Sequence, residues 1–146
     1  MKKITYILIL LVTFQGCKET TEKDTSEIAS EASVASESQV ILKILSPQEF
    51  EAKIGLDSLS QLVDVRTVEE YNDGHLSFAT NYSITDEDFQ KNAVSLVKER
   101  PVYVYCKSGG RSARASKLLV DLGFTQVYDL QGGITAWQAA GLPVVK

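Results

Sequence analysis

Short apolar runs alternate with amphipathic segments from about residue 40 to the end of the chain. The apolar runs are rich in Val, Ile, Leu and Tyr, a composition typical of strands buried in a sheet. The predicted strands are Val40–Ile44, Gln61–Asp64, Asn81–Ile84, Val102–Tyr105 and Gln126–Leu130.

Helix start signals lie between the first of these strands. Ser46-Pro47-Gln48-Glu49 is a capping box with proline at the first helical position, and it predicts a helix through Ile54. Thr67-Val68-Glu69-Glu70 is a second capping box. Thr85 is predicted to cap a third helix, whose apolar face carries Phe89, Ala93, Leu96 and Val97.

Two further helices are predicted near the end of the chain. The first has apolar residues at helical spacing before Gly123 ends the pattern: Ala115, Leu118, Leu119 and Leu122. The second is short and centred near Ala136. Strands that alternate with helices predict an α/β fold, a single domain over residues 40–146 with a mostly parallel sheet and helices on both faces. Sites in such folds lie at the carboxyl ends of the strands.

The first 16 residues have the pattern of a secretory signal. Lys2 and Lys3 are basic, and Ile4–Phe14 is almost entirely apolar but shorter than the ~20 residues that span a bilayer. Gly16-Cys17 at its end resembles a bacterial lipoprotein signal, although Phe14-Gln15 departs from the usual box. The resemblance implies lipid on Cys17 and an extracytoplasmic domain anchored to a bacterial membrane. Ordinary cleavage nearby and an uncleaved anchor remain alternatives.

Residues 17–39 differ in composition from the rest of the chain. After Cys17 they are rich in Ser, Thr and Glu, contain no aromatic residue and show no sustained period. Such a segment cannot bury enough apolar surface to fold. It is predicted to be a disordered acidic linker between the lipidated cysteine and the domain.

Charge and cysteine content exclude several classes of function. The net charge of −4 and the absence of a basic stripe argue against nucleic acid as a partner. There are two cysteines, so a lipidated Cys17 leaves Cys106 without a resolving partner, unlike a dithiol oxidoreductase. No Cys/His cluster suggests a metal, no cofactor is expected, and the domain is expected to be monomeric.

The candidate chemistry lies at Cys106, between the strand that ends at Tyr105 and a predicted helix. Backbone N–H groups and the positive end of a helix dipole stabilise a thiolate, so a lowered pKa is expected for this thiol. Four residues separate it from Arg111, one fewer than in cysteine-based phosphatases. A loop this tight fits a sulfur atom carried as a persulfide better than a phosphate. The alternative is a buried structural thiol.

The loop Cys106-Lys107-Ser108-Gly109-Gly110-Arg111-Ser112 resembles the C-x-x-G-x-R-S loop of rhodanese-like sulfurtransferases. Further motifs of that family occur in its order, covering about residues 40–145. They are Asp64-Val65-Arg66, Glu69-Glu70-Tyr71, Gly74-His75-Leu76, Gly132-Gly133-Ile134 with Ala136-Trp137, and Ala140-Gly141-Leu142-Pro143-Val144. Ser77-Phe78-Ala79 departs from the family's usual turn.

The resemblance implies that Cys106 carries sulfur from a donor such as thiosulfate or a persulfide to cyanide or a thiol. The loop from Lys107 to Ser112 would hold the persulfide and an anionic donor, and the positive charges of Lys107 and Arg111 would attract that donor or be merely solvated. The alternatives are a non-catalytic partner-binding module and, on a related fold, a phosphatase or arsenate reductase.

Four more residues are interpreted as structural. Asp64 and Arg66 are either loop charges or a buried pair that organises the sheet edge and supports the loop. His75 is the only histidine and is expected to be hydrogen-bonded at a turn, because an ionised thiol needs no general base. Trp137 is expected to be a core or lid residue.

Overall fold

The computed structural model describes residues 39–56, 58–85 and 87–146; the predicted signal, Cys17 and nearly all of the linker lie outside these ranges. The strands are β1 (Ile41–Leu45), β2 (Gln61–Asp64), β3 (Thr80–Asn81), β4 (Val102–Tyr105) and β5 (Gln126–Leu130). The helices are α1 (Pro47–Leu56), α2 (Val68–Asp73), α3 (Phe89–Ala93), α4 (Gly110–Asp121) and α5 (Gly133–Ala139). Among the described residues, no helix has both the length and the apolar content to cross a bilayer.

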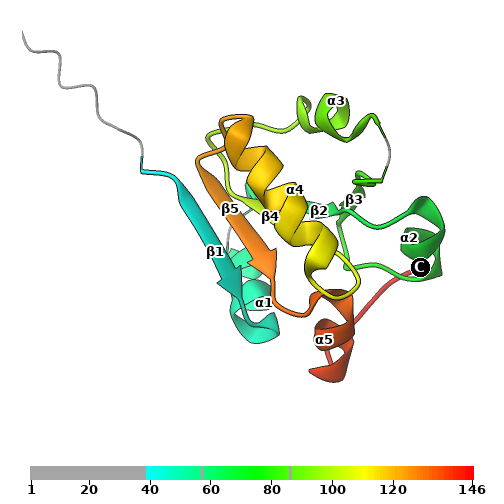
Figure 1. Ribbon diagram of the computed structural model, residues 1–146. Helices are drawn as coiled ribbons and strands as arrows, with labels where there is room; N and C mark the ends of the chain where they lie inside the picture. Colours follow the sequence, from blue (N-terminus) through cyan, green and yellow to red (C-terminus); the bar gives the residue numbers. More distant parts are fainter. Residues whose placement is uncertain (1–38, 57, 86) are drawn as a thin grey trace, which may run out of the picture. The chain divides into compact units, whose positions relative to one another are not determined.

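The strands form one parallel sheet in the order β1-β5-β4-β2-β3 (Figure 1). Helices α1 and α5 pack on one face, and α3 and α4 pack on the other. The predicted α/β fold, with a parallel sheet covered on both faces, is confirmed. Since β4 lies between β2 and β5, the residue that follows β4 reaches the middle of the sheet's carboxyl edge.

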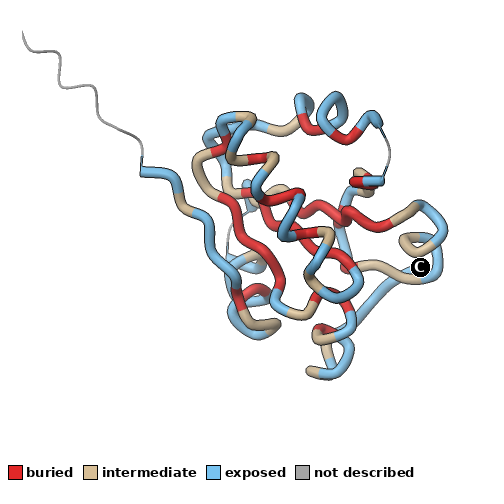
Figure 2. The backbone as a smooth tube through the Cα atoms, in the orientation of Figure 1, coloured by how far each residue is buried: buried red, intermediate tan, exposed pale blue. Residues whose placement is uncertain are grey.

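Alternate residues of the central strands supply two separate cores. Val102, Val104 and Cys106 belong to the cluster under α3 and α4, while Tyr103 and Tyr105 belong to the cluster under α1 and α5. Figure 2 shows these strands buried over most of their length. Because successive side chains point to opposite faces, alternate residues of a strand pack against different pairs of helices.

The core under α1 and α5 is built from aromatic rings. Phe50 packs edge-on against Tyr103 and Trp137, with centroids 5.4 and 6.3 Å apart. Tyr103 stacks on Tyr128 at 4.9 Å. The indole N–H of Trp137 donates to the carbonyl of Pro143 at 2.9 Å. Of the two roles considered for Trp137, the structure shows the core one.

Both capping boxes are present. The Ser46 N–H donates to Glu49 Oε2 at 2.9 Å, and the Glu49 N–H points back to the Ser46 hydroxyl at 3.4 Å. Thr67 and Glu70 make the same reciprocal pair at the start of α2. β2 and β5 have their predicted bounds, β1 is displaced by one residue, and α1 continues two residues beyond Ile54.

The segment between β3 and α3 was predicted wrongly. β3 covers only Thr80–Asn81, although the N–H groups of Tyr82 and Ile84 still donate to the carbonyls of Asp64 and Val65 at 2.9 and 3.2 Å. The N-cap of helix α3 is Asp88 and not Thr85, whose hydroxyl lies 2.8 Å from that of Ser83. The helix begins only at Phe89, and its buried residues are Phe89 and Ala93.

The unusual turn at Phe78 carries backbone strain. Its φ is +65°, in the left-handed region, and its side chain is 95 % exposed. For an L-residue with a Cβ this conformation costs about 1–2 kcal/mol, whereas glycine adopts it freely. The ring buries almost no surface in the domain to offset that strain.

Phe78→Gly is expected to raise the free energy of unfolding by about 0.5–1 kcal/mol, since relief of the left-handed strain exceeds the entropy that glycine adds to the unfolded chain. Urea unfolding measures the difference. Phe78→Ala is the matched control, because it removes the ring but keeps the strained backbone. Equal stability of the Gly and Ala variants would show that the left-handed backbone conformation of residue 78 does not destabilise the protein.

Candidate active site

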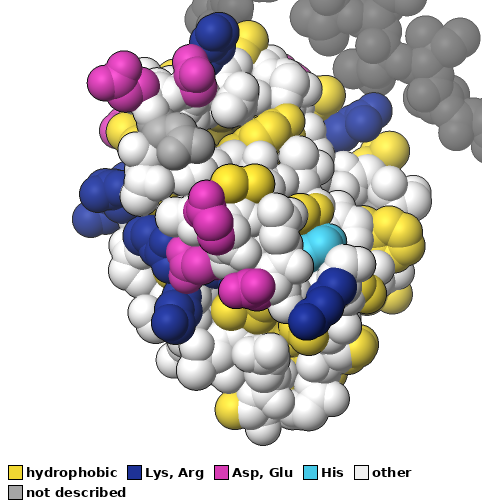
Figure 3. Space-filling model, turned by 90° about the vertical axis from the view of Figure 1, so that its right-hand side faces the viewer, with side chains coloured by type: hydrophobic (Ala, Val, Ile, Leu, Met, Phe, Trp, Pro, Cys, Tyr) yellow, Lys and Arg dark blue, Asp and Glu magenta, His cyan; other side chains and the backbone are white. Residues whose placement is uncertain are grey.

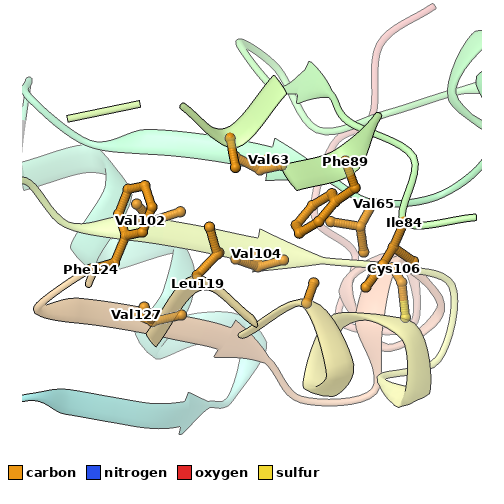
Figure 4. Packing of buried hydrophobic residues seen from close by; sticks show 12 residues of the cluster. Val63, Val65, Ile84, Phe89, Val102, Val104, Cys106, Leu119, Phe124 and Val127 are labelled. Atoms are coloured by element: carbon orange, nitrogen blue, oxygen red, sulfur yellow. The ribbon is translucent and has the colours of Figure 1, made fainter. Parts of the chain in front are cut away.

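Cys106 lies directly after β4, at the edge where the parallel strands end. Its side chain has the parity of Val104, so it points to the α4 side of the sheet. Figure 4 shows it beside Ile84 and Val65 at the end of the buried cluster. The residue is only 1 % exposed. The thiol is therefore held inside the loop and is not displayed on its surface.

Hydrogen-bond donors surround the sulfur. The N–H of Gly109 donates to Sγ at 3.1 Å. Burial, the largest single effect, raises the pKa of the Cys106 thiol, but the hydroxyl and N–H of Ser112 and the N–H groups of Ser108 and Gly109 together lower it below its usual value. Donors that stabilise an anion favour a reactive thiol over a structural one.

The start of α5 holds the loop in this shape. The N–H groups of Ile134 and Thr135 donate to the carbonyls of Cys106 and Lys107 at 2.8 and 3.1 Å. A Cβ on Gly133 would lie 2.3 Å from the Cys106 carbonyl oxygen, and Gly133 has φ +60°. Only glycine fits there. Gly133 of the Gly132-Gly133 motif thus allows the backbone of α5 to contact the backbone of the loop.

Arg111 is engaged by a carboxylate from a distant part of the chain. Its Nη1 and Nη2 donate to the two carboxylate oxygens of Glu70 at 2.6 and 2.8 Å. The Arg111 hydrogen bond lowers the pKa of Glu70 to about 2. Attraction of an anionic donor and a merely solvated charge were both considered for Arg111, and the structure shows its guanidinium paired with Glu70. From the sequence, Glu70 was assigned to a capping box and to a family motif but not to a pair with Arg111.

Asp64 and Arg66 form a buried ion pair, with side chains 0 % and 6 % exposed. Arg66 Nη2 donates to Asp64 Oδ2 at 2.6 Å and to the carbonyl of Gly74 at 2.8 Å. The N–H of Leu76 donates to the hydroxyl of Tyr105 at 3.1 Å. Of the two arrangements considered for this pair, the structure shows the buried one, tied to the segment after α2.

His75 and Lys107 take no part in the donor set around the sulfur. The His75 ring stacks on Tyr71 with centroids 3.7 Å apart, and its Nδ1 lies 3.0 Å from the Tyr71 carbonyl. The backbone of His75 pairs with Val145. Lys107 is exposed, and it meets α5 only through its carbonyl.

The surface near the histidine has no patch of a single charge. Figure 3 shows acidic and basic side chains interspersed on the face that carries it. Within the ranges that the structure describes, no cluster of His, Cys, Asp and Glu is arranged to hold a metal ion. The donors that stabilise an anionic Cys106 are the Ser112 hydroxyl and the N–H groups of Ser108, Gly109 and Ser112.

One buried acid near the loop was not singled out from the sequence. Asp129, in β5, is 4 % exposed and pairs in register with Val104. Burial raises its pKa to about 6. A carboxylate within an otherwise apolar strand was the available signal, because such a group is rarely buried without a reason.

Comparison with known proteins agrees with these features. The Rhodanese-like domain model matches residues 46–140. The "Sulfurtransferase" of Allochromatium vinosum is 35% identical over 102 residues, which cover 64% of this chain and 94% of that protein. "Thiosulfate sulfurtransferase 16, chloroplastic" of Arabidopsis thaliana is 37% identical over 91 residues, 56% and 76% of the two chains. The crystal structure of a rhodanese-related protein from Thermoplasma volcanium has a TM-score of 0.63 at 27% identity, covering 70% and 97%.

Gly133→Ala is expected to lower the free energy of unfolding by about 3 kcal/mol or more, since the methyl group collides with the Cys106 and Lys107 backbones and the left-handed φ is also penalised. Gly141→Ala is the matched control. It has a similar φ of +77° but nothing within 4 Å, so it should cost about 1–2 kcal/mol. If urea unfolding shows the same loss of stability in Gly133→Ala and Gly141→Ala, the close backbone contact at Gly133 is contradicted.

The pair of Glu70 and Arg111 should make stability depend on acid pH. The pKa of Glu70 is about 2 in the folded protein, against 4.5 ordinarily, so its stabilisation is present above pH 4.5 and is lost as the pH falls toward 2. Because the pair is about a quarter exposed, the loss should be about 1 kcal/mol. Urea unfolding across this range should show it in the wild type and in the exposed control Glu69→Gln. If Glu70→Gln loses the same stability between pH 4.5 and pH 2, the pair of Glu70 and Arg111 is not the source of that loss.

Proposed function

Because this chain belongs to the rhodanese-like domain family, we propose that it is a sulfurtransferase that carries sulfane sulfur as a persulfide on Cys106. The observation that carries the proposal is the set of N–H and O–H donors around Sγ, which lower the pKa of the thiol in spite of its burial. The relatives named as sulfurtransferases support it.

The first half-reaction begins with the Cys106 thiolate. It attacks the sulfane sulfur of a donor such as thiosulfate, and a new S–S bond forms at Sγ. The S–S bond within the donor breaks, and its electron pair leaves with sulfite. Proton removal is not required because the nucleophile is already an anion. The engagement of His75 with Tyr71 fits a reaction without a general base.

The second half-reaction returns the enzyme to its first state. The carbon of cyanide, or the sulfur of an acceptor thiolate, attacks the outer sulfur of the persulfide, and the S–S bond to Sγ breaks to regenerate the thiolate. The N–H groups from Lys107 to Ser112 would hold the persulfide charge between the two steps. Such donors are fixed before the reaction, so they need no reorganisation.

One observation favours the alternative of a non-catalytic partner-binding module. Cys106 is 1 % exposed, so a donor must displace the side chains around it, among them Ile84 (Figure 4). A purely structural cysteine, however, gains nothing from donors that stabilise an anion. The donor set therefore gives the catalytic function more support.

The proposed setting is outside the cytoplasm, on a lipid anchor at Cys17. It rests on the basic and apolar pattern of residues 1–16 and on the cysteine that follows it. A linker as polar as residues 18–39 would allow the domain to stand clear of the membrane.

Cys106→Ser should abolish sulfur transfer and leave the fold intact, because serine is nearly isosteric but supplies no sulfur. Intact mass spectrometry of the full-length protein should show a gain of one sulfur atom with thiosulfate, lost on addition of cyanide as thiocyanate forms. Cys17→Ser is the matched control and should retain the gain. A mass gain retained by Cys106→Ser would contradict the proposal. No mass gain in the folded wild type, with either thiosulfate or a polysulfide, would favour the partner-binding module.

A further inference from the structure

A groove lies on the face of the sheet opposite to the sulfur of Cys106. Its volume is about 490 Å³, within the roughly 300–1,000 Å³ typical of pockets for small molecules. Leu62, Leu76 and Trp137 line it and belong to the core under α1 and α5, whereas Cys106 belongs to the core under α3 and α4. The sheet therefore separates the groove from the proposed sulfur chemistry.

Three segments that are distant in the sequence form the groove. α1 contributes Glu51, Ile54 and Gly55, which share one face of the helix. The turn before β3 contributes Phe78, and α5 contributes Trp137. Apart from Glu51 and three serines, the residues that line the groove carry no polar side chain. An apolar wall with a few polar groups is the usual composition of a ligand site.

Hydrogen bonds hold two walls of the groove in place. The indole N–H of Trp137 donates to the carbonyl of Pro143 at 2.9 Å, and both residues line the groove. The N–H of Ala79 donates to the carbonyl of Leu76 at 3.1 Å, which closes the turn that carries Phe78. A groove with such fixed walls is formed before a ligand arrives, so binding costs little ordering of the protein.

Phe78 lines the groove at a cost to the domain. Its side chain is 95 % exposed, and its φ of +65° is strained. Neither the exposed ring nor the strained backbone contributes to the packing of the core. Backbone strain that the core does not require occurs mainly at binding and active sites. An aromatic ring in this position can cover an apolar ligand and face a cation.

The groove carries a single negative charge. Among the described residues that line it, Glu51 is the only charged one. The ion pairs in the described part of the chain do not include Glu51. The lysine of α1, Lys53, lies over the ring of Tyr128 instead, with Nζ 5.2 Å from the centroid. A carboxylate without a cationic partner attracts a cation to the groove and repels an anion.

We propose that this groove binds a small amphiphilic cation. The apolar body of the ligand packs between Ile54, Trp137 and Phe78, and its ammonium or guanidinium group lies beside Glu51. The apolar walls supply most of the affinity, and the carboxylate selects the sign of the charge. The same carboxylate disfavours an anion such as thiosulfate, so the ligand of the groove differs from the sulfur donor proposed for Cys106.

The first test uses the fluorescence of Trp137, the only tryptophan of the chain, in the full-length protein. Phenylbutylamine is the probe, and it should bind with a Kd of about 1 mM. The neutral phenylbutanol should bind about threefold more weakly, and the anionic phenylbutyrate about tenfold more weakly. Glu51→Gln should remove the difference between amine and alcohol. No saturable change with the amine, or equal Kd values for amine and anion in the wild type, would overturn the proposal.

Two leucine variants test where the amine binds. A Cβ at Gly55 would have no atom within 4 Å, so Gly55→Leu should fill the groove and weaken binding of phenylbutylamine at least tenfold. Ala52→Leu is the matched control. It introduces the same side chain at an exposed position of α1 that does not line the groove, and it should bind like the wild type. Wild-type affinity in Gly55→Leu would overturn the proposal.

Phe78→Gly is a second variant in case Gly55→Leu does not fold. It should be more stable than the wild type, because glycine relieves the strain, and yet bind phenylbutylamine about threefold more weakly. An unchanged Kd in this variant would contradict the proposal.

Sedimentation velocity without a ligand tests whether a second copy of the chain occupies the groove. The wild type should sediment as the same species as Gly55→Leu. A wild-type dimer that Gly55→Leu abolishes would assign the groove to a second copy and overturn the proposal. None of these measurements requires sulfur transfer.

Discussion

Two backbone hydrogen bonds between the start of α5 and the end of β4 determine the shape of the site. The N–H groups of Ile134 and Thr135 bind the carbonyls of Cys106 and Lys107, so these carbonyls turn to α5 while the N–H groups that follow turn to the sulfur. The backbones approach so closely that Gly133 has no room for a side chain. An interaction between a strand end and a helix about 30 residues later in the sequence therefore prepares the loop for an anion before any substrate arrives.

Two arginines near the loop are paired with carboxylates, so their charges are largely neutralised and are not free to attract an anionic substrate. Arg111 and Arg66 each hold a carboxylate, Glu70 and Asp64 respectively. Their value is geometric: the first pair fixes the start of α4 against α2, and the second fixes the end of β2 against the segment that follows α2. Negative charge at Cys106 is stabilised by the Ser112 hydroxyl and by oriented backbone N–H groups, which act at short range and resist screening by salt.

The alternation of side chains along parallel strands connects the core with the chemistry. In β4 the same parity that places Val104 under α4 aims Cys106 at the first turn of that helix, and in β5 it places Val127 in the same core. The opposite parity fills the other core with aromatic rings. The surroundings of the thiol are thus a consequence of strand register, and a shift of one residue would exchange the two cores.

Local patterns in the sequence determined the element order, the parallel α/β fold, both capping boxes and the position of the cysteine loop. They sufficed because periodicity and capping depend on residues only a few positions apart. The tertiary structure alone decided that Arg111 binds Glu70, 41 residues away, that Cys106 is enclosed, and that Asp129 is buried. These features depend on which strand ends, distant in the sequence, the sheet brings together. A pattern of neighbouring residues does not contain that information.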